Sequence, residues 1–253
     1  HRNRYERTDL QVPIRHLPAA FQGFRISFIS DVHSSVFMTK EHMVRYVDAV
    51  NNLQGDLIVV AGDFVNSMVD EVYPFAEAFA GLRAPYGVFG VLGNHDFYTR
   101  EVDTVAREVS QCGISLLRTE SITLVKGESR LVIAGVDDVG SVSRAATLFD
   151  SALAEAPSGA PRILLCHRPY YFQQAADRNI DLVLSGHTHG GQIVFGTLPT
   201  GVLAPARVVS RYVAGLYTIG ASQMYVSRGI GTVGVPIRFY CPPEITSLTL
   251  VAA

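Results

Sequence analysis

Five strand-like runs of this sequence are each followed within three residues by aspartate, asparagine or histidine. The runs cover residues 24–30, 56–61, 88–92, 162–166 and 181–184. Short runs rich in valine, isoleucine and leucine predict buried strands. Helical segments are predicted over residues 41–53, 71–82, 100–111 and 143–154. This alternation of strands and helices predicts an α/β fold.

The polar residues after these runs are the candidate site residues. They are Asp31, His33, Asp63, Asn94, His95, His167, His187 and His189. Taken singly, Asp31 with His33, and Asp63, are better explained by ordinary turns, whereas the run Gly-Asn-His-Asp at 93–96 is a sharper signal of a site. Five of the eight histidines nevertheless fall at these points. Ligand sites of α/β sheets lie beyond the carboxyl ends of the strands, so we expect these side chains to converge.

The remaining segments give a coarser picture. Residues 1–20 predict an extended arm with one edge strand, and residues 114–136 a hairpin that turns at 126–128. Residues 192–240 predict two or three antiparallel strands with long loops, and residues 244–251 a final strand. With 48% hydrophobic residues in a chain of 253, we expect one large domain over residues 1–253.

Composition limits the classes of partner. The net charge of −2 gives no electrostatic case for nucleic-acid binding. No apolar run is long enough to span a membrane, although the 17% charged residues and positive mean hydropathy fit a membrane neighbour. Because the chain starts at His1 rather than Met, we expect an N-terminal anchor or signal outside it. The three cysteines lack CxxC spacing and predict buried thiols.

The order of the motifs resembles the calcineurin-like metallophosphoesterase superfamily. The motifs are Asp-x-His at 31–33, Gly-Asp at 62–63, Gly-Asn-His-Asp at 93–96, His167, and Gly-His-x-His at 186–189. Residues 225–231 and 242–246 are similar to a bacterial branch, often membrane-anchored or exported, that includes UDP-2,3-diacylglucosamine pyrophosphohydrolases and cell-wall-associated phosphoesterases. The resemblance implies a four-layer α/β/β/α sandwich. It also implies a membrane-associated or cell-envelope location in a bacterium, with the cytoplasm as the alternative.

The resemblance also implies two metal ions and their ligands. The first ion would be held by Asp31, His33 and His189, and the second by Asn94, His167 and His187. Asp63 would bridge the two. Nitrogen and oxygen ligands of this kind fit manganese, iron or zinc and argue against calcium. We expect manganese, with iron or zinc as alternatives.

By the same resemblance, a metal-bridging hydroxide would attack a phosphodiester or pyrophosphate, and His95 would stabilise or protonate the leaving oxygen. Asp96 is expected to hold the His95 ring. Arg168 and Arg228 are candidates for substrate contact, with surface ion pairs as the alternative. Asp137 and Asp138 have no assigned ligand role.

The substrate class stays open from sequence. A lipid-linked nucleotide such as UDP-2,3-diacylglucosamine would be bound at a membrane surface, and it would require an apolar groove beside the metals. Candidates for that groove, with core packing as the alternative, are Val194, Phe195, Leu198 and Val202. The alternatives for function are a phosphomonoesterase and a non-catalytic scaffold of the same fold.

Overall fold

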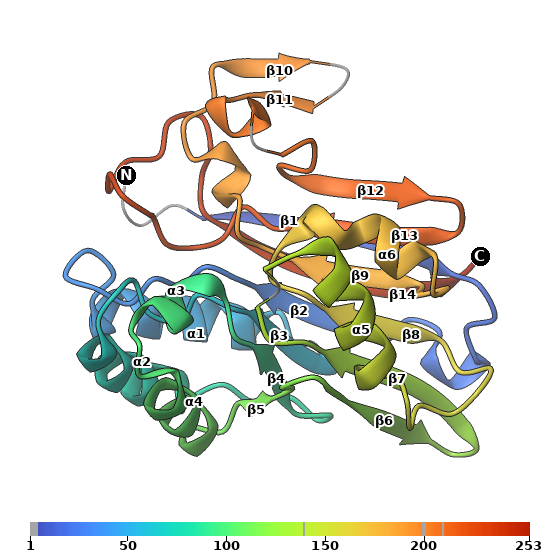
Figure 1. Ribbon diagram of the computed structural model, residues 1–253. Helices are drawn as coiled ribbons and strands as arrows, with labels where there is room; N and C mark the ends of the chain where they lie inside the picture. The colour runs from blue at the N-terminus through green and yellow to red at the C-terminus, as the bar shows by residue number, and fades with distance from the viewer. Residues whose placement is uncertain (1–4, 139, 199–200, 209) are drawn as a thin grey trace.

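Two six-stranded sheets lie face to face in the computed structural model, with helices on both outer faces (Figure 1). The structure describes residues 5–138, 140–198, 201–208 and 210–253. The first sheet has the order β1 (Glu6–Ile14), β14 (Glu244–Ala252), β2 (Arg25–Ile29), β3 (Leu57–Ala61), β4 (Val88–Val91) and β5 (Ser115–Leu116). The second has the order β12 (Gly215–Ile219), β13 (Ser222–Val226), β9 (Leu182–Ser185), β8 (Arg162–Leu165), β7 (Ser129–Gly135) and β6 (Glu120–Lys126).

The central strands of each sheet are parallel, and this pairing decides where the loops meet. Strands β2, β3, β4 and β5 run parallel in the first sheet, as do β7, β8, β9 and β13 in the second. Beside these parallel strands, β14 is antiparallel to β2, and β6 forms an antiparallel hairpin with β7. The loops after the parallel strands of one sheet therefore gather at one edge.

Apolar side chains fill the space between the sheets and beneath the helices. Phe28 and Val59 of the first sheet join Leu165 and Leu184 of the second in one buried cluster. The helices α1 (Lys40–Asn52), α2 (Val72–Phe79) and α4 (Val102–Gln111) cover the other face of the first sheet. The second sheet is covered by α5 (Val142–Ala152) and α6 (Phe172–Ala176). The expected four-layer α/β/β/α sandwich is confirmed.

Several short elements were not predicted. One is α3 (Asn94–Tyr98), and the others are the 3-10 helices η1 (Ala19–Phe21), η2 (Val69–Glu71), η3 (Pro169–Tyr171), η4 (His189–Gly191) and η5 (Pro205–Val208). The edge strand in the N-terminal arm is β1, and the expected hairpin is β6–β7. None of the helices in the described ranges is both long and apolar enough to cross a bilayer.

The expectation of antiparallel strands in residues 192–240 was correct for both strand pairs of the segment, but the expected number of two or three was too low. This segment contains β10 (Gly196–Leu198) and β11 (Gly201–Leu203), which form a separate hairpin, as well as β12 and β13. In addition, β13 is antiparallel to β12 on one side but parallel to β9 on the other. Alternation along one strand does not report the direction of its partner, so the sequence could not separate these cases.

Candidate metal centre

The candidate ligands follow the carboxyl ends of β2, β3, β4, β8 and β9. Five of them adopt left-handed backbone conformations, namely Asp31 (φ 52°), His33 (φ 49°), Asp63 (φ 54°), His187 (φ 72°) and His189 (φ 52°). Such φ values are uncommon for non-glycine residues and cost on the order of 1–3 kcal/mol each. Their concentration at one edge of the molecule marks a functional site.

Three of these side chains form a buried group at the ends of β2 and β9. The Nε2 atoms of His33 and His189 lie 3.0 Å apart. His189 Nε2 also lies 3.6 Å from Asp31 Oδ1. The ligand atoms of Asp31, His33 and His189 all lie within 4.8 Å of one another, which is the spacing of groups that can share one cation.

A second group surrounds Asp63 from the other side. The ligand atoms of Asp63, His167 and His187 lie within 4.8 Å of one another. Asp63 Oδ2 is 3.2 Å from His167 Nε2 and 3.5 Å from His33 Nε2. One carboxylate therefore faces both groups, as the bridging position between two cations requires.

Two further observations show that this pocket fits divalent cations. The buried Asn94 Oδ1 has no hydrogen-bond partner among the described residues, although a buried amide oxygen normally has one. His167 Nδ1–H donates to the Ala61 carbonyl over 2.7 Å. That bond leaves Nε2 as the nitrogen that faces Asp63, the arrangement usual for metal-binding imidazoles.

Backbone amides hold the two carboxylates in place. The His187 N–H donates to Asp31 Oδ1 and the His95 N–H donates to Asp63 Oδ1, both over 2.8 Å. Gly93 allows the close approach of Asp63, because a Cβ at this position would collide with the Asp63 carboxylate. The loops after β3 and β4 are therefore fitted to each other at this residue.

Burial and neighbouring charges shift the pKa values of the cluster. Burial lowers the pKa values of His33 and His187 to about 3 and raises that of Asp31 to about 6. Burial would raise the pKa of Asp63, but His167 and the other histidines lower it well below its usual range. Burial would also lower the pKa of His167, but the Asp63 carboxylate raises it to about 10.

His95 lies at the more open side of the cluster. Its half-buried ring stands edge-on to His33, with ring centroids 4.6 Å apart. The ring Nδ1 hydrogen bonds with the Asn66 carbonyl. This bond fixes the ring orientation, so the atom that holds the ring is Asn66 O and not the expected Asp96 carboxylate.

Asp96 has a different task from the one predicted. Its buried carboxylate accepts hydrogen bonds from the backbone N–H groups of Asp63, Phe64, Val65 and Gly93, over 2.8–3.2 Å. It therefore ties the loop after β3 to the loop after β4. The expectation that it contacts the His95 ring was wrong, because sequence adjacency does not tell which way two neighbouring side chains point.

The two candidate arginines differ in position. Arg168 follows His167 directly and forms a two-pronged ion pair with Asp138, at 2.7 and 2.9 Å. Arg228 instead pairs with Glu6 at 2.9 Å and Glu244 at 3.2 Å, which ties it to β1 and β14. For Arg228 the structure shows the alternative expected from sequence, an ion pair, and substrate contact by this residue stays a prediction.

Sequence reasoning missed Arg238. Its buried guanidinium donates to the backbone carbonyls of Arg228, Gly229 and Gly231, and Nη2 lies 3.4 Å from His189 Nδ1. The side chain thus fixes the loop that follows β13 against a candidate metal ligand. The only signal in the sequence was an isolated charge within the apolar stretch Val235–Tyr240.

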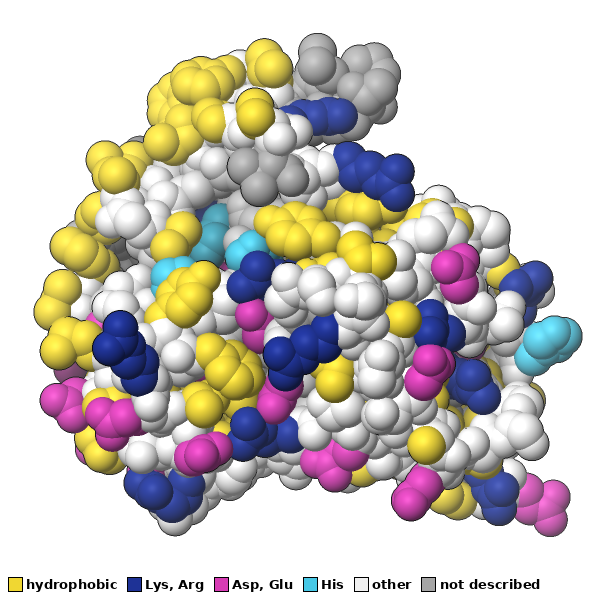
Figure 2. Space-filling view, in the orientation of Figure 1, with side chains coloured by type: hydrophobic (Ala, Val, Ile, Leu, Met, Phe, Trp, Pro, Cys, Tyr) yellow, Lys and Arg dark blue, Asp and Glu magenta, His cyan; other side chains and the backbone are white. Residues whose placement is uncertain are grey.

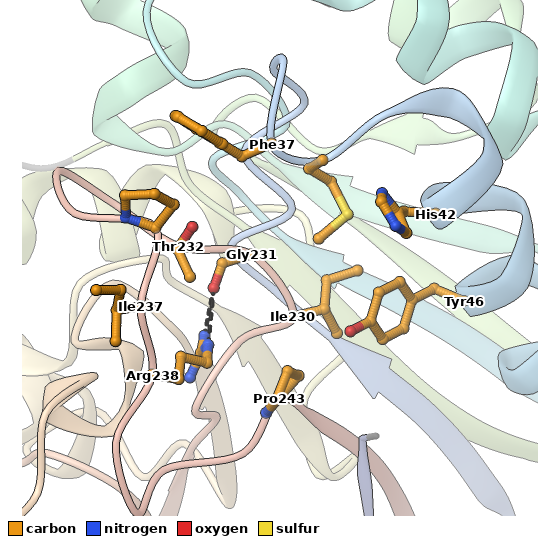
Figure 3. Close-up of a pocket in the computed structure, with 11 residues that line it drawn as sticks. Phe37, His42, Tyr46, Ile230, Gly231, Thr232, Ile237, Arg238 and Pro243 are labelled. Atoms are coloured by element: carbon orange, nitrogen blue, oxygen red, sulfur yellow. Dashed lines mark hydrogen bonds between the residues drawn. The ribbon is translucent and has the colours of Figure 1, made fainter. Parts of the chain in front are cut away.

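An apolar cavity of about 260 Å³ lies on the other side of Arg238 (Figure 3). Phe37 and Tyr46 come from one wall, and Ile230, Ile237 and Arg238 from the facing loop. This cavity is not the groove expected from sequence. Of the four groove candidates, Val194 packs in a small core cluster, Phe195 is exposed, and the side chains of Leu198 and Val202 lie outside the described part.

Comparisons with known proteins agree with this geometry. A family model described as "Calcineurin-like phosphoesterase" matches residues 24–191. The Bacillus subtilis protein "Uncharacterized metallophosphoesterase YkuE" is 31% identical over 97% of this chain and 85% of its own length. The Danio rerio "Transmembrane protein with metallophosphoesterase domain" is also 31% identical, over 97% of this chain but only 57% of its own length. A Helicobacter pylori "Uncharacterized metallophosphoesterase" is 32% identical, and this chain spans 63% of it.

Solved structures support the fold. TT1561 of Thermus thermophilus superposes with a TM-score of 0.52 at 18% identity, over 83% of this chain and 91% of that chain. The phosphopantetheinyl hydrolase PptH of Mycobacterium tuberculosis superposes with a TM-score of 0.50 at 14% identity, over 81% of this chain and 89% of that chain. At these identities the likeness concerns the fold alone.

Proposed function

Because this chain belongs to the calcineurin-like phosphoesterases, we propose that it is a metal-dependent hydrolase of a phosphodiester or pyrophosphate bond. The observation that carries the proposal is the convergence of candidate ligands from separate strand ends on the Asp63 carboxylate. A scaffold that binds no metal would not need a metal-binding residue type at every one of these ligand positions. The proposal treats residues 1–253 as one metallophosphoesterase domain.

The proposed ligand sets follow the two groups of side chains. Asp31, His33 and His189 hold one cation, and His167 and His187 hold the other, with Asp63 shared. Asn94, whose buried Oδ1 has no hydrogen-bond partner among the described residues, is assigned to the second cation. The ligand atoms of His95 also lie within 4.8 Å of those of His33 and Asp63, but the proposal assigns His95 to the substrate. Two bound divalent cations would supply activation of water and neutralisation of charge on the phosphoryl oxygens. We propose manganese, with iron or zinc as alternatives, since the mixed nitrogen and oxygen ligands do not suit calcium.

His95 and Arg168 complete the proposed site. The bond from His95 to the Asn66 carbonyl keeps the Nδ1 proton in place, so the proton that His95 exchanges with a leaving oxygen is carried on Nε2. Asp138 holds the Arg168 guanidinium next to the cluster, where its charge reaches His187. We propose that Arg168 binds a phosphoryl oxygen of the substrate, for which its planar donors are suited.

The proposed substrate is a lipid-linked nucleotide such as UDP-2,3-diacylglucosamine, hydrolysed at a bacterial membrane or cell-envelope surface. Support comes from the apolar cavity, which shares Arg238 with the candidate metal centre. A phosphomonoesterase with the same ligands remains the alternative, because the motif set does not distinguish the two reactions.

Substrate panels on metal-reconstituted protein test this proposal. Protein loaded with Mn²⁺ is assayed on bis(p-nitrophenyl) phosphate, on p-nitrophenyl phosphate and on UDP-2,3-diacylglucosamine, with Asp63→Ala as the inactive control. We expect turnover of the diester and of the lipid-linked nucleotide, and its loss on addition of EDTA. Turnover of the monoester alone would identify a phosphomonoesterase. Failure to hydrolyse any of the three would contradict the proposal.

A further inference from the structure

Exposed apolar side chains from three loops lie side by side next to the candidate metal centre. We call them the apolar rim, and they are Phe37, Phe195, Leu203, Ile237, Phe239 and Tyr240. Single exposed hydrophobic residues are ordinary, but a contiguous group marks an interaction surface. Figure 2 shows yellow side chains along the left margin and over the β10–β11 hairpin, beside a hollow in which cyan histidines are visible.

The contacts of the rim show that its three loops are joined. Phe37 and Ile237 line the same cavity, so the loop after β2 adjoins the loop after β13. The Val194 N–H donates to the Phe239 carbonyl over 2.9 Å, and the Phe195 N–H to the Leu203 carbonyl over 2.8 Å. These contacts place the loop after β2, the loop after β13 and the β10–β11 hairpin next to one another.

The rim is also tied to the candidate ligands. The Gly231 N–H donates to the Asp31 carbonyl over 2.7 Å, at the start of the loop that carries Ile237 and Tyr240. Arg238, in the middle of that loop, contacts both Gly231 and His189. A surface bound by the rim would thus lie beside the opening of the site.

The charges of this region indicate what the rim binds. From Leu182 to Pro243 the chain contains no aspartate or glutamate, and it contains four arginines, Arg207, Arg211, Arg228 and Arg238. The net charge of −2 for the whole chain therefore conceals one basic segment. Arg228 is ion-paired with Glu6 and Glu244, and Arg238 is buried, so the positive charge beside the rim comes from Arg207 and Arg211, which follow the β10–β11 hairpin in the chain. Large apolar side chains beside arginines, in a segment without acidic residues, are the combination that binds anionic membrane surfaces.

We propose that the apolar rim inserts into the surface of an anionic lipid bilayer and seats the candidate metal centre against it. This inference names the surface at which the proposed hydrolysis would take place, and it rests on that proposed function. Binding to lipid can be measured on metal-free protein without any turnover, so failure of the inference and failure of the proposed hydrolysis can be told apart.

Flotation with vesicles tests the inference. Vesicles of phosphatidylcholine alone and of phosphatidylcholine with phosphatidylglycerol are compared, using the wild type and Ile237→Glu. Val125→Glu is the matched control, because Val125 on β6 is 58% exposed and Ile237 is 56% exposed. We expect binding to the anionic vesicles that weakens with salt, a loss of about tenfold or more in Ile237→Glu, and no loss in Val125→Glu. Circular dichroism checks that both variants are folded.

Three outcomes would overturn the inference. The first is no binding of the wild type to anionic vesicles, and the second is equal loss in the two variants. The third is a dimer in sedimentation velocity, without lipid, that Ile237→Glu converts to a monomer. That result would assign the rim to a second copy of the chain.

Discussion

The Nε2 atoms of His33 and His189 lie 3.0 Å apart in the folded chain, although 156 residues separate them in sequence. His33 follows the first parallel strand of one sheet, and His189 follows a central strand of the other. Their contact therefore depends on the face-to-face packing of the two sheets. A cation between them would stabilise that packing as well as serve the chemistry.

Removal of the shared carboxylate tests the bridging role. Asp63 faces His33 on one side and His167 on the other. We expect Asp63→Ala to lose both cations, because the substitution removes the carboxylate that faces both groups of ligands. Metal content by inductively coupled plasma mass spectrometry after dialysis measures this. Retention of two ions per chain would contradict the assignment of Asp63.

His95 is expected to act on the substrate and not on the metals. We predict that His95→Ala keeps the metal content of the wild type while its turnover falls by roughly 10²–10⁴-fold. Turnover of bis(p-nitrophenyl) phosphate and metal content are measured on the same preparation. Metal loss equal to that of Asp63→Ala would show that His95 is a ligand.

Asp96 is predicted to be structural. In Asp96→Asn, one acceptor oxygen becomes an amide donor that faces backbone N–H groups, so the free energy of unfolding should fall by about 1–3 kcal/mol. Denaturation of the metal-free protein measures this, with Asp150→Asn as the control. Asp150 pairs with Arg178 at the surface, and its loss should change stability by less than about 1 kcal/mol. Equal stability of the two variants would contradict this role.

The raised pKa of His167 predicts a pH dependence of metal binding. With its pKa raised to about 10 by Asp63, His167 carries a proton at pH 7.5 in the metal-free protein. A ligand nitrogen must lose that proton, so metal affinity should rise with pH and fall on acidification. Titration calorimetry in buffers of low and high ionisation enthalpy should show about one proton more released by the wild type than by His167→Asn. An identical buffer dependence would contradict the assignment.

A substitution of Gly93 tests whether metal binding needs the close contact between the loops after β3 and β4. We predict that Gly93→Ala displaces Asp63 and weakens metal binding, because the added Cβ collides with the Asp63 carboxylate. Gly140→Ala is the control, since a Cβ there has nothing within 4 Å. Metal affinities of the two variants are compared by calorimetry. Equal affinities would show that the loops can separate without loss of the site.

Sequence patterns located the central strands, the main helices and the candidate ligands, because each central strand is a short apolar run and each candidate ligand follows one within a few residues. The four-layer arrangement came from the motif order, since periodicity alone does not say how two sheets stack. The orientation of Asp96, the partners of the Arg228 ion pairs and the role of Arg238 could not be predicted. Each of these depends on contacts between distant segments, which leave no local pattern.

The most direct test of the account is the location of metal ions in crystals grown with Mn²⁺, by anomalous scattering. The account predicts two peaks, one among Asp31, His33 and His189 and one among Asn94, His167 and His187, with Asp63 between them. No peak at these side chains, or peaks only at other positions, would contradict it.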